Sequence, residues 1–215
     1  MGKLDFGLYF ITDRALSRSG VISDAKAAIR AGVRIVQYRE KSLARERMIA
    51  EAREIAGLCK KANVTFIVND YIDVAVASAA DGLHIGPCDM PLAEARKTLG
   101  DGKIIGVTAG SVADALRFER AGADYIGLSP IFATATKKDA GQPVGLDAIR
   151  EASKRLRIPF VAIGGINREN LTSVLDAGAK SVCMISAILK SGGIEKEVRE
   201  IRGIINEHAA RKGKK

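Results

Sequence analysis

Short apolar runs alternate along the chain with longer segments that have helical spacing. In segments such as 44–62, 111–121 and 167–177, apolar residues recur three and four positions apart, which predicts amphipathic helices. The apolar runs themselves are short and rich in β-branched residues, which is typical of buried strands. They cover residues 7–12, 33–38, 64–69, 82–86, 104–108, 124–129, 159–164 and 181–186.

The alternation of strand and helix predicts the fold class. A strand, a helix and a further parallel strand form a right-handed crossover, so repeated units build a parallel sheet. Eight such units within 215 residues predict an α/β protein with a single (β/α)8 barrel, or TIM barrel. The alternative is an open doubly wound sheet, but no G-x-G-x-x-G motif follows the first predicted strand. We therefore expect the barrel.

The positive charge of the chain is concentrated at its C-terminal end. The formal net charge is +9, and 211-RKGKK-215 supplies four of the positive charges. We expect a catalytic barrel domain over 1–208 and a basic tail over 209–215. Aromatic residues make up only 5% of the chain, and no basic segment is interleaved with aromatics, so nucleic acid is not an expected partner. A mildly basic barrel instead suits phosphorylated small molecules, which a positive field concentrates.

The apolar runs and the cysteines indicate the compartment. The longest uninterrupted apolar runs hold about six residues, whereas a membrane span needs roughly twenty. The start MGKLDFGLYF lacks a signal-peptide pattern. Cys59, Cys88 and Cys183 are odd in number and irregularly spaced, which argues against a disulfide framework and a zinc cluster. We expect a soluble cytoplasmic protein with no membrane partner.

Polar residues follow the predicted strands, where the active site of a (β/α)8 barrel lies. In 37-QYREK-41, Arg39 and Lys41 are two positions apart in an extended segment, so both cations project to one side. Such a pair suits a phosphate-rich ligand. The alternative is a surface salt-bridge network with Glu40 and Glu46.

Two aspartates follow neighbouring predicted strands. Asp70 ends the motif 69-ND-70, and Asp89 ends the motif 84-HIGPCD-89. Two carboxylates that converge above a barrel, with waters and substrate phosphates as the remaining ligands, form the usual kind of magnesium site. Each aspartate also opens a predicted helix, so the alternative is that both are helix N-caps.

Three further features are each open to two interpretations. The motif 164-GGI-166 lets backbone N–H groups approach an anion, and barrel phosphate sites commonly follow strands seven and eight; the alternative is a tight βα turn. His84 either packs within its strand or contacts a substrate ring. The hydroxyl-rich segment 129–143 is either a solvated surface loop or a lid that excludes water.

Taken together, these motifs resemble the thiamine-phosphate synthase family. The resemblance covers about residues 7 to 190, and the family's (β/α)8 fold agrees with the fold that the periodicity predicts. It rests on 37-QYREK-41, 69-ND-70, 84-HIGPCD-89, 132-FATATK-137, 164-GGI-166 and 185-ISAI-188.

The resemblance implies a transferase that joins hydroxymethylpyrimidine diphosphate to a thiazole monophosphate and releases pyrophosphate, with Mg²⁺ as cofactor. In the family, the bond to pyrophosphate is thought to break first, and the thiazole nitrogen then captures the pyrimidine cation. The implied metal ligands are Asp70 and Asp89. The implied catalytic residues are Arg39, Lys41 and Lys137.

The resemblance also implies which residues bind the two substrates. The diphosphate group is assigned to Arg39, Lys41, Asn69 and Lys137, and Tyr38 and Glu40 of the motif 37-QYREK-41 are assigned to substrate binding as well. The pyrimidine is assigned to Gln37 and Thr108, with Tyr9 and His84 as further candidates. The thiazole phosphate is assigned to Thr134, Thr136, Gly165, Ile185 and Ser186.

Some positions depart from the family pattern. Pro87 stands where the family usually has Gln, Ser129 where Gly is common, and Thr108 where Ser is frequent.

A related branch, the thiazole tautomerases, relies on a histidine after the fifth strand, and this chain has none between His84 and His208. That difference favours the synthase. A rival of another class is a non-catalytic phosphate-sensing or nucleic-acid-binding protein that uses the basic tail. The sequence is compatible with a homo-oligomer.

Overall fold

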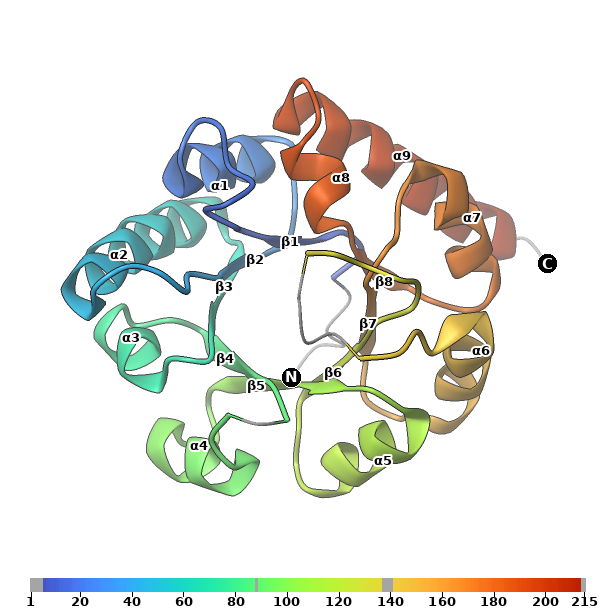
Figure 1. Cartoon of the computed structure of the whole chain (residues 1–215), viewed down its shortest axis with the longest axis horizontal. Helices are drawn as coiled ribbons and strands as arrows, with labels where there is room; N and C mark the ends of the chain where they lie inside the picture. The colour runs from blue at the N-terminus through green and yellow to red at the C-terminus, as the bar shows by residue number, and fades with distance from the viewer. Residues whose placement is uncertain (1–5, 88, 137–140, 214–215) are drawn as a thin grey trace.

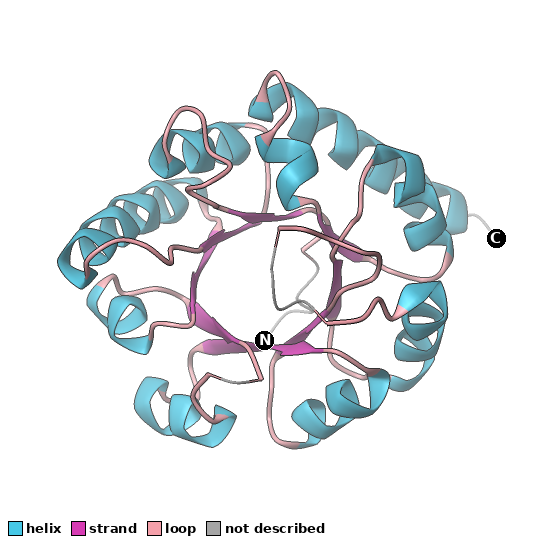
Figure 2. Cartoon of the chain, viewed as in Figure 1, coloured by secondary structure: helices cyan, strands magenta, loops and turns pink. Residues whose placement is uncertain are grey.

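The eight predicted strands form a closed parallel barrel. The computed structural model describes residues 6–87, 89–136 and 141–213. Within these ranges the strands pair in chain order from β1 to β8, and helices cover the outside of the barrel (Figure 1; Figure 2). The strands are β1 (Tyr9–Ile11), β2 (Ile35–Tyr38), β3 (Thr65–Asn69), β4 (Gly82–Ile85), β5 (Ile104–Ala109), β6 (Tyr125–Leu128), β7 (Phe160–Ile163) and β8 (Ser181–Cys183).

Helices connect successive strands, and in the described part of the chain two further helices follow β8. In the described ranges they are α1 (Val21–Arg30), α2 (Arg45–Ala62), α3 (Ile72–Ala77), α4 (Leu92–Leu99), α5 (Val112–Arg120), α6 (Gly145–Arg155), α7 (Arg168–Asp176), α8 (Ile185–Leu189) and α9 (Ile194–Lys212). Ser111 and Asn167 are the N-caps of α5 and α7, and their side chains accept backbone N–H groups of the first turn. The helices predicted over 111–121 and 167–177 are therefore confirmed.

The first and last strands close the barrel. Leu8 forms a parallel bridge with Val182, and the Val182 N–H donates to the Gly7 carbonyl at 2.9 Å. An open doubly wound sheet would leave two edge strands unpaired, whereas closure removes both edges. The predicted (β/α)8 barrel is confirmed, and the open sheet is excluded.

Successive residues of each strand enter two different apolar cores. In β1, Tyr9 and Ile11 point into the barrel, while Phe10 packs outward in the layer between sheet and helices. A parallel strand buried on both faces reads as a continuous apolar run, which is the pattern that predicted these strands. The interior core consists of Phe6, Tyr9, Ile11, Ile35, Ile67, Ile104, Tyr125, Val161 and Cys183.

The basic segment expected as a tail from residue 209 begins inside α9, which continues to Lys212. Lys212 Nζ donates to the Leu175 carbonyl at 3.2 Å, and His208 Nε2 lies 2.8 Å from Asp176 Oδ1. The end of α9 thus packs against the C-terminal end of α7. The boundary between barrel and tail at residue 208 falls within a helix.

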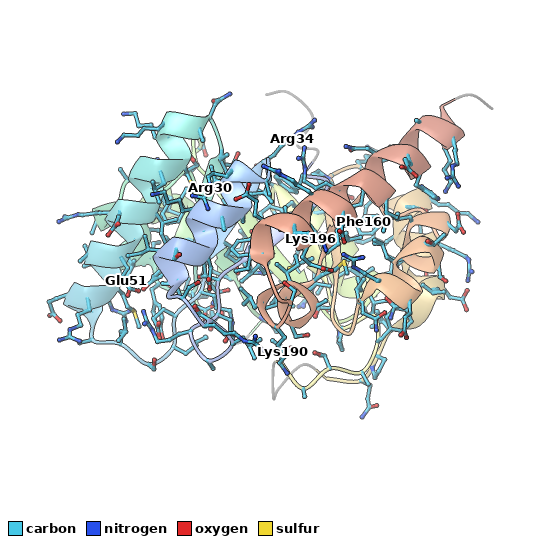
Figure 3. The ribbon with its side chains drawn as sticks, turned by 90° about the horizontal axis from the view of Figure 1, so that it is seen from above. Arg30, Arg34, Glu51, Phe160, Lys190 and Lys196 are labelled. Carbon is cyan, nitrogen blue, oxygen red and sulfur yellow. The ribbon has the colours of Figure 1, made fainter. Side chains whose placement is uncertain are left out.

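All eight strands run in one direction, so their carboxyl ends meet at one end of the barrel. Figure 3 shows the barrel from the side, with Arg34, just before β2, at one end and Lys190, just after α8, at the other. The polar residues that follow the strands lie at the Lys190 end. Among the described residues, no helix is long and apolar enough to cross a membrane.

Candidate active site

A cavity of about 320 Å³ opens at the carboxyl ends of the strands. It is lined by most of the residues that the sequence singled out, and the three departures from the family pattern, Pro87, Thr108 and Ser129, also line it. Lys137 lies outside the described residues. The candidates that line the cavity are Tyr9, Gln37, Arg39, Lys41, Asn69, Asp70, His84, Asp89, Thr108, Thr134, Thr136, Gly165, Ile185 and Ser186.

Tyr38 and Glu40, which the resemblance assigns to the substrate, face away from the cavity. The Tyr38 hydroxyl donates to Glu51 Oε2 on α2 at 2.7 Å. The Glu40 side chain is 1% exposed and forms an ion pair with Arg14, which also bonds Glu51. Side chains of an extended segment alternate between its two sides, so these two residues point outward while their neighbours point inward. The assignment of Tyr38 and Glu40 as substrate contacts is therefore corrected: both support the loop from behind.

Glu40 is a charged anchor for the loop after β2. Its Oε1 accepts the N–H groups of Lys41 and Ser42 at 2.9 and 2.7 Å, and the Ser42 hydroxyl at 2.6 Å. Burial by itself raises the pKa of Glu40, but the bonds from Ser42 and Arg14 outweigh burial and lower this pKa to about 2. The carboxylate stays ionised and holds the loop in one conformation.

Arg39 and Lys41 face the cavity, and each is paired with an aspartate. Arg39 Nη1 donates to Asp13 Oδ2 at 2.6 Å, and Lys41 forms an ion pair with Asp70. The alternative interpretation, in which Arg39 and Lys41 form salt bridges with Glu40, is wrong about the partner, because Glu40 forms its ion pair with Arg14. Asp13 is 6% exposed and follows β1. Sequence reasoning missed Asp13, although a charged residue directly after the first strand was a usable signal.

Asp70 and Asp89 lie together at the rim of the cavity. Asp70 has a left-handed backbone with φ of 61°, a conformation that costs energy in a non-glycine residue and is concentrated at functional sites. Burial and the contact with Asp89 raise the pKa of the Asp70 carboxyl, whereas Lys41 acts in the opposite direction. Asp89 Oδ2 accepts the Gly86 N–H at 2.6 Å. Two neighbouring carboxylates at an open rim repel each other unless a cation or a proton lies between them.

These aspartates suit a magnesium ion better than a capping role. The N-cap residues of α3 and α4 are Tyr71 and Pro91, so the N-cap alternative is wrong for both aspartates. No group of three or more His, Cys, Asp and Glu side chains in the described ranges could hold a metal. Mg²⁺ nevertheless is usually bound by one or two carboxylates, with waters and substrate phosphates as the other ligands. Asp70 and Asp89 fit that kind of site.

Hydrogen bonds join five residues across the floor of the cavity. Gln37 Nε2 donates to the Tyr9 hydroxyl at 2.9 Å, and the Tyr9 and Tyr125 hydroxyl oxygens are 2.7 Å apart. His84 Nδ1 lies 2.9 Å from the Tyr125 hydroxyl, and His84 Nε2 lies 2.8 Å from Thr108 Oγ1. Burial raises the pKa of both tyrosines, so both hydroxyls stay protonated. His84 is at once a hydrogen-bonded strand residue and part of the cavity wall.

The segment after β6 packs onto the end of β7 through two glycines. Gly164 and Gly165 have φ of 102° and 64°, and a Cβ on Gly165 would lie 2.7 Å from Phe132 Cβ. The Phe132 N–H donates to the Gly164 carbonyl at 3.0 Å, and Ile131 is fully buried. The two glycines therefore form a tight turn that the facing segment covers. The described part of this segment, up to residue 136, is not a freely solvated loop.

Two threonine hydroxyls of this segment face the cavity. Thr134 Oγ1 accepts the Thr136 N–H at 3.2 Å, which fixes the two residues relative to each other. Gly165 and Ser186 also line the cavity. Hydroxyls and exposed backbone N–H groups are donors that suit an anionic oxygen without adding charge.

The cavity combines a buried floor with two polar walls. Ile11, Val161 and Ile163 add apolar surface to the floor beside the hydrogen-bonded Tyr125 ring. Cations and carboxylates follow β2 to β4, whereas threonine and serine hydroxyls follow β6 and β8. The fold and the cavity at the carboxyl ends of the strands together define a (β/α)8 barrel of the class of enzymes that act on small molecules.

The comparisons with known proteins identify the family within this class. The chain belongs to the thiamine monophosphate synthase family, whose model matches residues 8–188. It is 49% identical over 203 residues to a thiamine-phosphate synthase of Methanosarcina mazei, covering 94% of this chain and 84% of the relative. It is 45% identical over 193 residues to a thiamine-phosphate synthase of Clostridium novyi, covering 89% and 95%.

A solved structure gives the same result. A thiamine phosphate pyrophosphorylase from Pyrococcus furiosus superposes with a TM-score of 0.88 at 34% identity, covering 95% of this chain and 97% of that chain. The predicted family resemblance is confirmed. The chain is an enzyme of the family, a transferase of thiamine biosynthesis.

Proposed function

We propose that this enzyme joins hydroxymethylpyrimidine diphosphate to a thiazole monophosphate, forming thiamine phosphate and pyrophosphate with Mg²⁺ bound. The observation that carries the proposal is the division of the cavity into a charged wall after β2 to β4 and a hydroxyl-bearing wall after β6 to β8, over one buried floor. Two anionic groups can then bind at opposite walls, while the two rings meet between them over the floor.

The charged wall suits the diphosphate. Arg39 and Lys41 supply positive charge, and Asn69 supplies an amide donor at 8% exposure. Asp70 and Asp89 would hold Mg²⁺, which would supply positive charge to the diphosphate. Lys137 is proposed as a further diphosphate contact from the resemblance of 132-FATATK-137 to the family motif.

The hydroxyl-bearing wall suits the thiazole phosphate. Thr134 and Thr136 are fixed relative to each other by their hydrogen bond, and both line the cavity. Gly165, Ile185 and Ser186 complete this wall. A monophosphate there is bound by neutral donors, so the two anionic groups do not compete for the same cations.

The chemical step breaks one bond and forms another. The bond between the pyrimidine methylene carbon and the diphosphate oxygen breaks, and its electron pair leaves with pyrophosphate. The lone pair of the thiazole nitrogen then forms the new carbon–nitrogen bond, so no oxidant or reductant is needed. Arg39 and Lys41 stabilise charge that grows on the leaving group, and the buried floor limits the access of water to the cation.

A turnover assay with both substrates tests the proposal. Purified protein with the pyrimidine diphosphate, the thiazole phosphate and Mg²⁺ is expected to produce thiamine phosphate, and a chelator is expected to abolish production. Asp89→Ala should lower turnover by at least about a hundredfold. The matched control is Asp73→Ala, because Asp73 lies on α3 near this rim, pairs with Arg45 and has a side chain that is 55% exposed. Absence of product from folded wild-type protein would refute the synthase, and thiazole tautomerisation would be assayed next.

We also infer that the enzyme works in a reducing compartment such as the cytoplasm. Cys59 and Cys183 are free and buried. Burial raises the pKa of both thiols, so neither is poised for disulfide chemistry. Mass spectrometry of the protein isolated from its source under alkylating conditions tests this inference, since an oxidised form of either cysteine would contradict it.

A further inference from the structure

The hydrogen-bonded chain under the cavity joins residues from five different strands. Tyr9 lies on β1, Gln37 on β2, His84 on β4, Thr108 on β5 and Tyr125 on β6. The chain runs from Gln37 through Tyr9, Tyr125 and His84 to Thr108. All five residues line the cavity. Gln37, Tyr9 and Tyr125 are at most 2% exposed, whereas Thr108, at the other end of the hydrogen-bonded chain, is half-buried.

The number of available protons determines the direction of donation along these hydrogen bonds. Each neutral phenol has one proton to donate, and a buried donor without an acceptor costs on the order of 1–3 kcal/mol. Gln37 Nε2 donates to Tyr9 and has no lone pair to accept, so the Tyr9 proton must go to Tyr125. The Tyr125 proton then goes to His84 Nδ1, which leaves the ring proton on Nε2 to be donated to Thr108.

We propose that Tyr125 is a positioning residue, which holds His84 as the Nε2–H tautomer and so directs the Thr108 hydroxyl proton into the cavity. Because Thr108 Oγ1 accepts from His84, the hydroxyl proton of Thr108 is the one left to donate to a bound ligand. The site thereby selects a substrate ring that presents a hydrogen-bond acceptor at this point. The inference that the selected acceptor is a ring nitrogen of the pyrimidine rests on the proposed function. The inference about the tautomer of His84 does not depend on that function.

The surroundings of Tyr125 keep its hydroxyl in place. The Phe6 ring meets the Tyr9 and Tyr125 rings edge to face, with centroids 5.6 and 5.3 Å away. Gly106 on β5 leaves the space that the Tyr125 ring occupies, since a Cβ at Gly106 would overlap that ring. His84 and Tyr125 rings also pack together, with centroids 5.5 Å apart. The ring of Tyr125 thus has one packed position, from which its hydroxyl reaches both neighbours.

The opposite direction has a distinct structural signature. If the Gln37 amide were reversed, its oxygen would accept from Tyr9. The donor and the acceptor would then be exchanged in every hydrogen bond between Gln37 and Thr108. His84 would then carry its proton on Nδ1, and Thr108 would donate to His84 and present only lone pairs to the cavity. A doubly protonated His84 would leave one tyrosine proton without an acceptor. The three states of the ring are distinguishable by nitrogen NMR.

The first experiment measures the tautomer of His84 in the full-length protein labelled with ¹⁵N at histidine. The His208→Gln variant, on the outer helix α9, leaves the signals of His84 as the only ones and so assigns them. Wild type is expected to show a protonated Nε2 and a pyridine-type Nδ1. In Tyr125→Phe the fixed tautomer should give way to a mixture, whereas Tyr38→Phe, whose hydroxyl bonds Glu51 on α2, should leave it unchanged. A protonated Nδ1, a doubly protonated ring, or an unchanged tautomer in Tyr125→Phe overturns the proposal.

The second experiment measures what the Thr108 proton selects. Calorimetry compares hydroxymethylpyrimidine diphosphate with two analogues in which one ring nitrogen at a time is replaced by C–H. Wild type and Thr108→Ser should bind one analogue on the order of tenfold more weakly than the parent, and Thr108→Val should lose that discrimination. Equal binding of both analogues by wild type would contradict the selection. Binding requires no turnover, so failure of the synthase assay leaves both results interpretable.

Discussion

Glu40→Gln removes a buried negative charge from the loop that carries Arg39 and Lys41. In the folded protein the pKa of Glu40 is lowered to about 2, against an ordinary value of 4.5, because donors from Ser42 and Arg14 outweigh the effect of burial. The gap between these two values corresponds to about 3 kcal/mol of folding free energy. We expect Glu40→Gln to lower the free energy of unfolding at neutral pH by about 2 to 3 kcal/mol, since the amide keeps some of the acceptor bonds.

The contribution of Glu40 to the free energy of unfolding should change with pH in a definite direction. A carboxyl whose pKa is lower in the folded state binds fewer protons there, so it stabilises the fold above the unfolded pKa. That stabilisation is lost as the pH falls from 4.5 towards 2. The difference in stability between wild type and Glu40→Gln should therefore be largest at neutral pH and narrow steadily below pH 4.5.

Urea unfolding followed by circular dichroism across this pH range is the assay. Glu54→Gln is the control, because Glu54 is an exposed carboxylate on α2 and its replacement should change stability by no more than about 0.5 kcal/mol. Equal stability of the two variants, or a gap that does not narrow in acid, would refute the reasoning. A Glu40→Gln protein that is fully stable but has a strongly raised KM would instead make Glu40 a substrate contact.

Three further outcomes are expected. Lys41→Ala should lower kcat by at least about a hundredfold in the thiamine phosphate assay, with an unchanged circular dichroism spectrum, and near wild-type turnover would remove Lys41 from the leaving-group site. Gly165→Ala should raise the KM for the thiazole phosphate in steady-state kinetics, because the new Cβ would lie 2.5 Å from a carbonyl oxygen of the facing segment. In a Cys88→Ser variant, Cys59 and Cys183 should react with a thiol reagent only when the protein unfolds, because burial raises the pKa of both thiols. Fast labelling of the native protein would contradict this prediction.

The sequence determined the order of elements and the end of the barrel that carries the site. Both follow from local properties: apolar runs buried on two faces make strands, and parallel strands bring all their carboxyl ends to one side. Arg39 and Asp70 could therefore be assigned to one end of the barrel without any knowledge of their contacts, and the resemblance to the family added Thr108 and Thr134. The two-residue period of an extended segment also predicted that Arg39 and Lys41 share a side.

Only the tertiary structure decided which partners these residues have. Glu40 faces Arg14 from another loop, and Tyr38 faces Glu51 on α2, so a motif that reads as one binding unit divides between the cavity and the support behind it. Tyr125 reads in the sequence as one more strand residue. Its hydroxyl gains a role from Tyr9, which is 116 positions away in the chain. Periodicity is a property of neighbours in sequence, whereas hydrogen-bond direction depends on groups that only the closed barrel brings within 3 Å.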